Sequence, residues 1–406
     1  MIYQSHTLEN GLRIVHVPTE GNVLYCGFYV NAGTRDEADD EYGIAHFVEH
    51  MLFKGTKKRR AHHIVNRMEN VGGELNAYTN KEETVIYSIF LKEHFERAFE
   101  LLTDITFHSQ FPQREMDKEK HVIIDEIDSY EDSPSELIYD DFENILFEGS
   151  GLGHNILGDP ETLENFTSAD LKAFVSRNYK ANNIVFFSLG QYDFKKIIRY
   201  AEKYLAEIPA GSDTPNRLDV SNIDAVSKKL IKDTSQVHAL IGGRGYNIKD
   251  PKRKAFSLLN NILGGPGMNS RLNIELREKK GYVYGVESSA TAYSNTGMFS
   301  IYFGTGHRNE QKCIDIIHRE LKKMKTNKLS ATQLAAAKKQ MMGQMAVARD
   351  NRESLTLSLG RSFFHFNHIN SLEESFAFIE NITSNDLLEV ANEIFDESNL
   401  FQLVYN

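Results

Sequence analysis

The sequence has little cysteine, no long apolar run and no excess of basic residues. Only Cys26 and Cys313 occur in 406 residues, which argues against a disulfide framework and suits a reducing compartment. No apolar stretch approaches the roughly 20 residues that a membrane-spanning helix needs. Residues 1–11 have neither the basic nor the apolar region of a signal peptide, so we expect none. The net charge of -11 disfavours nucleic acid as a partner, because phosphate binding needs a basic patch. We therefore expect a cytoplasmic protein with no nucleic-acid or membrane partner.

What the sequence does contain is the pentapeptide His46-x-x-Glu49-His50 within an otherwise apolar segment. Read as a helix, this segment places the two histidines one turn apart on the same face, with Glu49 on the same side. Two imidazoles so placed can bind one zinc ion, and a neighbouring carboxylate can handle a proton of water. His-x-x-Glu-His is the inverted form of the His-Glu-x-x-His signature of zinc peptidases. The alternative is a surface helix that carries these three residues by coincidence.

A third ligand is available further along the chain. Glu126 lies 76 residues after His50 (126 − 50), in a helical pattern that begins near Gln113. Glu119 precedes Glu126 by seven residues, which is two helical turns on the same face. A carboxylate from a second helix completes a site of two histidines and one glutamate and leaves a fourth position open for water.

With this spacing, the chain resembles the pitrilysin/insulinase family of zinc metallopeptidases, which includes the mitochondrial processing peptidase. The resemblance implies that His46, His50 and Glu126 bind one zinc ion per chain. It also implies that Glu49 is the general base and that Glu119 is an accessory carboxylate that helps to position the site.

The resemblance extends to two further segments. In the family, the strand that matches Asn76 and Ala77 is a sheet edge to which an extended peptide substrate adds as another strand; without the resemblance, a plain structural hairpin is the simpler interpretation. Family members also carry a Gly-Gly loop followed by an Arg and a Tyr seven residues apart that contact substrate. Arg277 and Tyr284 have that spacing (284 − 277 = 7). The alternative for this pair is a capped helix end with favourably placed cations.

The order of predicted elements repeats along the chain. Phe166–Leu171 matches Ile382–Leu387 at an offset of 216, and Tyr78-Thr79-Asn80 matches Tyr293-Ser294-Asn295 at an offset of 215. We therefore predict two duplicated α+β domains, each an antiparallel-rich sheet packed with helices. Their expected bounds are 1–208 and 223–406, joined by a linker over 209–222. The helix of the second domain that corresponds to the metal helix has no His, Glu or Asp, so one metal site per chain is expected.

These observations predict a zinc-dependent endopeptidase that hydrolyses short or unfolded peptides. Family chains of this length usually pair, so the resemblance implies a homodimer or a heterodimer with a paralogue. Two alternatives stay open: a non-catalytic subunit of the family, and a peptide-binding or chaperone-like module that uses the same fold. His154, in a glycine-rich loop, has no ligand partner nearby in the sequence, and we expect it to be structural.

Overall fold

A computed structural model describes residues 2–211, 217–221, 223–232 and 234–406, and its packing divides the chain into two compact units. The first unit comprises Met1–Ile127, His154–Arg217 and Ala348–Ser371. The second comprises Asp128–Gly153, Leu218–Val347 and Leu372–Asn406. Residues 212–216 and 222 of the expected linker lie outside the described part. The expected domain bounds at 208 and 223 remain a prediction, because these units are groups of packed segments and not divisions along the chain.

The first unit is built on a six-stranded mixed sheet with the order β1-β2-β6-β3-β5-β4. Only β2 and β6 run parallel, and the other neighbours are antiparallel. The hairpin between β1 and β2 turns at Asn10-Gly11, where Gly11 has a φ of 90° that a residue with a Cβ rarely adopts. The strands are β1 Gln4–Thr7, β2 Arg13–Val17, β3 Val23–Val30, β4 Glu74–Thr79, β5 Thr84–Leu91 and β6 Ile184–Leu189.

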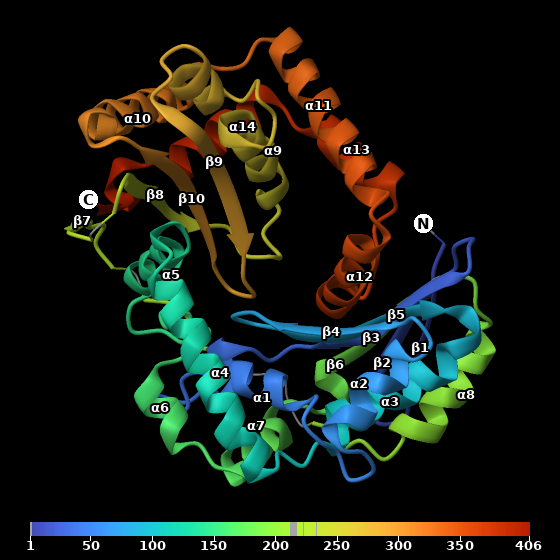
Figure 1. Ribbon diagram of the computed structural model, residues 1–406. Helices are drawn as coiled ribbons and strands as arrows, with labels where there is room; N and C mark the ends of the chain where they lie inside the picture. Colours follow the sequence, from blue (N-terminus) through green and yellow to red (C-terminus); the bar gives the residue numbers. More distant parts are fainter. Residues whose placement is uncertain (1, 212–216, 222, 233) are drawn as a thin grey trace. The chain divides into compact units, whose positions relative to one another are not determined.

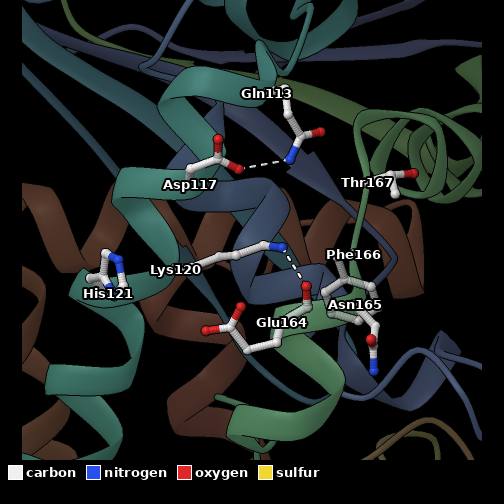
Figure 2. Close-up of a pocket in the computed structure, with 8 residues that line it drawn as sticks. All are labelled: Gln113, Asp117, Lys120, His121, Glu164, Asn165, Phe166 and Thr167. Atoms are coloured by element: carbon white, nitrogen blue, oxygen red, sulfur yellow. Dashed lines mark hydrogen bonds between the residues drawn. The ribbon is translucent and has the colours of Figure 1, made fainter.

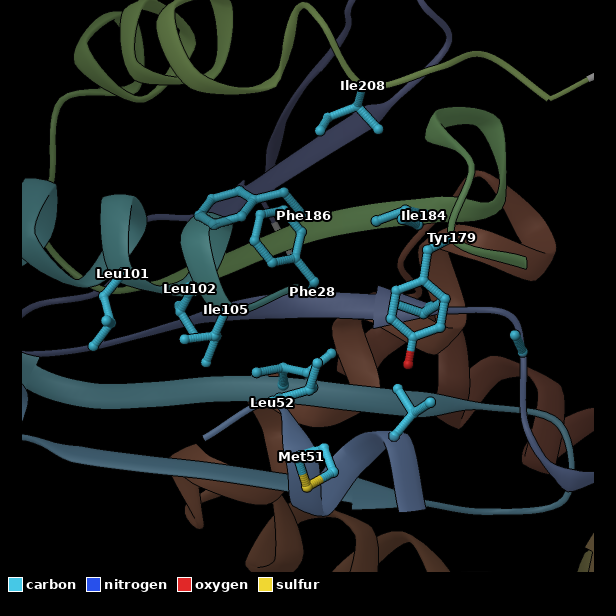
Figure 3. Close-up of a cluster of buried hydrophobic side chains, with 14 of the residues drawn as sticks. Phe28, Met51, Leu52, Leu101, Leu102, Ile105, Tyr179, Ile184, Phe186 and Ile208 are labelled. Carbon is cyan, nitrogen blue, oxygen red and sulfur yellow. The ribbon is translucent and has the colours of Figure 1, made fainter. Parts of the chain in front are cut away.

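Helices cover both faces of this sheet (Figure 1). The main core lies on one face, where side chains such as Phe28 and Phe186 of the sheet meet Met51, Leu52 and Ile105 (Figure 3). The other face packs against α12, a helix from the second half of the chain. The helices of the unit are α1 Ile44–Met51, α2 Ala61–Glu69, α3 Phe95–His108, α4 Gln113–Glu131 as far as Ile127, α6 Pro160–Asn165, α7 Ser168–Asn178, α8 Phe194–Leu205 and α12 Arg352–Phe366, with 3-10 turns at Thr34–Asp36, Lys92–His94 and Ala181–Asn183.

The second unit repeats this plan on a five-stranded sheet with the order β7-β11-β8-β10-β9. One face packs against α9, α10 and α14, and the other packs against α5, a helix from the first half of the chain (Figure 1). The strands are β7 Ser227–Leu230, β8 Val237–Gly245, β9 Val283–Ala292, β10 Gly297–Thr305 and β11 Phe401–Tyr405. The helices are α5 Pro134–Leu146, α9 Arg253–Gly264, α10 Glu310–Thr326, α11 Ala331–Arg349, α13 Leu372–Asn381 and α14 Ser384–Ile394, with a π-helical turn at Asn273–Glu278 and 3-10 turns at His307–Asn309 and Glu397–Asn399.

The two sheets confirm the predicted α+β duplication. The order β2-β6-β3-β5-β4 corresponds strand for strand to β7-β11-β8-β10-β9, and the one parallel pair falls at the same place in both. The repeated sequence at an offset of 216 opens equivalent helices, because Thr167 and Asp170 form a capping box at α7 and Thr383 and Asp386 form one at α14. None of the helices in the described part of the chain has both the length and the apolar character that crossing a bilayer requires.

Candidate metal centre

The pentapeptide lies on α1, as the sequence predicts. Ile44, Phe47, Val48 and Met51 are fully buried in the core of the first unit, so the opposite side of the helix presents its polar groups away from the core. His46 and His50 lie one turn apart, with ring centroids separated by 4.5 Å. The apolar face therefore fixes the direction in which both imidazoles point.

Glu126 on α4 brings the third ligand to these histidines. Its Oε2 lies 3.5 Å from Nε2 of His50 and 3.9 Å from Nε2 of His46. One ligand atom from each residue falls within 4.8 Å of the others, and no other such group of three occurs in the described part of the chain. Ligand atoms that surround a tetrahedral zinc at about 2.1 Å lie about 3.4 Å from one another. The donor set and its spacing therefore fit one zinc ion.

His50 is oriented by a second carboxylate. Its Nδ1 lies 3.1 Å from Oε1 of Glu119, and Oε2 of Glu119 lies 2.6 Å from Nζ of Lys54. Burial alone would raise the pKa of Glu119, but the hydrogen bonds from His50 and Lys54 bring that pKa below its usual value. An ionised Glu119 accepts the proton on Nδ1 and so leaves the lone pair of Nε2, on the side of Glu126, free to bind a metal. The accessory role expected of Glu119 thus has a geometric basis, and Lys54 is a contributor that the sequence analysis missed.

His46 differs from His50 in its surroundings. Its Nδ1 is buried with no hydrogen-bond partner among the described residues, whereas a metal-ligating histidine usually donates this proton to an outer partner. Burial, together with the nearby charge of His50, lowers the pKa of His46 to about 3. The ring is therefore neutral at physiological pH, which is the form that binds a metal.

Glu49 faces the edge strand β4. Its carboxyl group is hydrogen-bonded by the side chain and backbone of Thr79. Burial raises the pKa of Glu49, against the opposing effect of those hydrogen bonds. A carboxyl group whose pKa is raised toward neutrality gains and loses a proton at neutral pH more readily than one with the usual pKa.

Asn76 and Ala77 lie on the same strand as Thr79. They pair with Tyr87 and Ile86 of β5, and β4 is the last strand of the sheet on that side. Among the described strands, none pairs with the far edge of β4, and Thr79 on this strand interacts with Glu49. Thr79 is a partner of Glu49 that the sequence analysis did not identify.

Arg277 and Tyr284 belong to the second unit and lie close to each other. The guanidinium carbon of Arg277 is 5.9 Å from the ring centroid of Tyr284. Tyr284 is 93% exposed. Both residues line a cavity of about 580 Å³, together with the loop Gly264-Gly265-Pro266 and part of β9. The predicted pair is therefore a local feature of one surface, and its role toward substrate stays a prediction.

A second cavity, of ≈ 440 Å³, lies on α4 but does not include the metal cluster. It is lined by four residues of α4 and by residues 164–167, which run from the end of α6 to the residue before α7 (Figure 2). Gln113 donates to Asp117, and Lys120 donates to the backbone carbonyl of Glu164. These polar groups are hydrogen-bonded to one another. Because the cavity includes none of the three proposed ligands, it adds nothing to the metal centre.

Two histidines from one helix and a glutamate from another form the donor set of a peptidase-type zinc centre, and similarity to known proteins agrees with it. Residues 14–160 match the family model described as "Insulinase (Peptidase family M16)", and residues 165–341 match the one described as "Peptidase M16 inactive domain". The chain belongs to peptidase family M16, the insulinase family, as the resemblance predicted.

Its relatives match over nearly their whole length. An uncharacterized zinc protease of Bacillus subtilis, YmxG, is 31% identical over 98% of this chain and 97% of its own. The beta subunit of the mitochondrial-processing peptidase of Saccharomyces cerevisiae is 29% identical over 95% of this chain and 87% of its own. A solved structure from Pseudomonas fluorescens, described as a peptidase M16 inactive domain, shares the fold with a TM-score of 0.93 at 21% identity, over 100% of this chain and 98% of that one.

Proposed function

We propose that the protein is a zinc-dependent endopeptidase that hydrolyses short or unfolded peptides. The observation that carries the proposal is the convergence of His46, His50 and Glu126, with Glu49 beside them on α1. Membership of family M16 and the naming of full-length relatives as zinc proteases support it.

Each residue of the centre has a distinct task in this proposal. His46, His50 and Glu126 hold the zinc ion. When bound, zinc supplies Lewis acidity, which makes water more acidic and polarises a carbonyl group. Glu49 accepts a proton from the attacking water and returns it to the leaving amine, for which its raised pKa is suited. Glu119 and Lys54 keep Nδ1 of His50 engaged, so that Nε2 stays available for the metal.

The edge of β4 offers a way to bind substrates of varied sequence. A peptide that adds to this edge as a strand is held by main-chain hydrogen bonds, each worth about 0.5–1.5 kcal/mol. Because such pairing requires an extended backbone, it selects unfolded chains over folded ones. Asn76 and Ala77 would then lie beside the substrate strand, on the strand that carries Thr79, the partner of Glu49.

The proposal extends to a dimer, a homodimer or a heterodimer with a paralogue, in which Arg277 and Tyr284 serve substrate. The metal cluster belongs to the first unit and the Arg-Tyr pair to the second, so the two groups of proposed functional residues lie in different units. A guanidinium and a phenol are suitable donors for a peptide carbonyl and for the oxyanion that develops from it.

A chelator-controlled peptidase assay tests the proposal. The protein should cleave a quenched fluorescent peptide, lose activity with a chelator, regain it with zinc, and contain one zinc ion per chain. His50→Ala should lose both the metal and the activity, whereas His63→Ala, on the exposed side of α2, should keep both. Binding of the peptide without cleavage would favour the peptide-binding module, and equal zinc in wild type and His50→Ala would contradict the ligand assignment.

A further inference from the structure

The first turn of α1 is capped by a side chain from outside the helix. The residue before the helix is Gly43, which has a φ of 94° and no side chain with which to cap. Oε2 of Glu37 accepts the N–H of Gly43 at 3.0 Å, and Oε1 accepts the N–H of Ala45 at 2.8 Å. The N–H groups of a first helical turn have no partner within the helix. One remote carboxyl group thus serves two N–H groups at the start of the metal helix.

The position of the cap matters because α1 is only 8 residues long. Ile44 is its first residue, so His46 is its third and lies within the first turn. An uncapped first turn frays most readily, since its hydrogen bonds are the least supported. A metal ligand at this place depends on the cap more directly than His50, which lies one turn further along.

Glu37 is itself held by His154, the histidine that the sequence left without a partner. Nε2 of His154 lies 2.9 Å from Oε2 of Glu37, and the Glu37 side chain has 0% exposure. The imidazole ring stacks on Tyr42, with centroids 4.0 Å apart and planes inclined by 13°. The ring stack fixes the imidazole, and the imidazole fixes the carboxyl group.

Glu37 and His154 interact as two neutral groups through a hydrogen bond, and not as an ion pair. Burial raises the pKa of Glu37 well above its usual range, although the N–H groups of Ala45 and Gly43 act in the opposite direction. Burial also lowers the pKa of His154 to about 4. Between Oε2 and Nε2, one shared proton satisfies both groups without a buried charge.

The cap is also connected to the strand that carries Thr79. Nζ of Lys81, in the turn after β4, donates to the backbone carbonyl of His154. The N–H of Arg35, two residues before Glu37, donates to the carbonyl of Lys81 at 2.7 Å. Glu37 and His154 therefore join the start of α1 to the end of β4, the two elements between which Glu49 and Thr79 are hydrogen-bonded.

We infer that Glu37 and His154 are positioning residues of the metal centre, which hold the first turn of α1 so that His46 stays in place to bind the metal. The inference rests on the proposed zinc site. Neither residue touches the metal cluster, so both act through the backbone of α1. Their effect should therefore appear as a change in zinc affinity even where no substrate is present.

Two variants test the inference through zinc binding. In Glu37→Gln, the amide nitrogen replaces an oxygen that accepts an N–H, so one donor of the first turn loses its partner. His154→Phe keeps a ring to stack on Tyr42 but removes Nε2. Competition with a chromophoric chelator should show zinc bound about tenfold more weakly by each, within the range found for outer-shell partners of metal ligands. Because both act through one hydrogen bond, the double variant should be no weaker than the weaker single variant.

Asp386→Asn is the matched control, because it weakens a capping box on α14 in the second unit, which holds none of the proposed ligands. It should lower the unfolding temperature without changing the zinc dissociation constant. In the Glu37 and His154 variants, the rise in unfolding temperature on adding zinc should shrink, because that rise follows the zinc affinity.

Unchanged zinc affinity in His154→Phe, with or without a loss of stability, would overturn the inference and assign the pair a purely structural role. This variant also decides the matter if Glu37→Gln does not fold. A wild-type protein that binds no zinc would instead overturn the proposed function, so the two failures are separable.

Discussion

Three glutamates lie at the candidate metal centre, and their carboxylate groups have different surroundings. Glu126 faces both histidines, Glu119 is held between His50 and Lys54, and Glu49 is half-buried beside Thr79. Burial raises the pKa of Glu49, whereas hydrogen bonds from His50 and Lys54 overcome burial and lower that of Glu119. These opposite shifts agree with the proposed roles, in which Glu49 transfers a proton and Glu119 stays charged.

Glu49→Gln tests this assignment of roles. The amide can occupy the same space beside Thr79 but cannot take a proton at neutral pH. We expect zinc content to remain that of the wild type and peptide hydrolysis to fall by a factor of about 10² or more. Metal analysis and a fluorescent-peptide assay on one sample measure both. Glu115→Gln, which alters a surface pair with Lys118 on α4, should change neither, and near-normal turnover by Glu49→Gln would show that another group is the base.

At the scale of single elements, α12 covers the face of the first sheet opposite the main core. Gly360 lies where the helix approaches the sheet most closely. A Cβ added there would meet Cδ1 of Phe187 at 2.7 Å and Cβ of Tyr29 at 2.8 Å. By contrast, Gly343 on α11 has nothing within 4 Å of an added Cβ. The two helical glycines therefore differ in the room beside them: Gly360 is buried against the sheet, whereas Gly343 is exposed.

Substitution by alanine at each glycine should have opposite effects. Gly343→Ala should raise the free energy of unfolding by about 0.5–1 kcal/mol, because alanine is the better helix former. Gly360→Ala gains the same propensity but forces buried side chains apart, and overpacking costs about 1–3 kcal/mol. We expect a net loss of stability for Gly360→Ala, measured by thermal or denaturant unfolding. Equal stabilisation by both substitutions would mean that α12 is not packed tightly on the sheet.

At the scale of the whole molecule, the proposed dimer assigns the metal cluster of one chain and the Arg-Tyr pair of its partner to a common site. The expectation follows from the family resemblance and from the separation of the two groups into different units. Loss of one donor to a developing oxyanion reduces the rate by about 10²–10³. Glu49→Gln and Tyr284→Phe homodimers should therefore both be nearly inactive.

Mixing these two inactive homodimers provides the test. Each heterodimer would contain one site with both defects and one site with neither, so each heterodimer should have about half of the activity of a wild-type dimer. Subunit exchange is verified by mass or by a tag, and sedimentation confirms the dimer. Exchange without any recovery of activity would show that the sites form within one chain or do not use Tyr284.

Much of the fold and of the centre follows from the sequence by itself, because it depends on local periodicity. Within the pentapeptide on α1, within the pair of carboxylates on α4 and within each capping box of α7 and α14, the residues are about one or two helical turns apart, and such spacings fix a common face. The repeat at an offset of 216 likewise predicts two similar sheets, because the same order of elements buries the same faces. Each of these features can be predicted without knowing which segment lies opposite.

Only the tertiary structure decided which distant segments meet. Amphipathic patterns indicate that α5 and α12 each bury one face, but they do not indicate against what. In the structure, α5 covers the sheet of the second half of the chain and α12 covers that of the first half. Likewise, Glu37 and His154 are 117 residues apart, and neither spacing nor composition links them. Their contact arises because a helix whose first residue follows a glycine needs an acceptor from elsewhere, and only the folded chain determines which side chain supplies it.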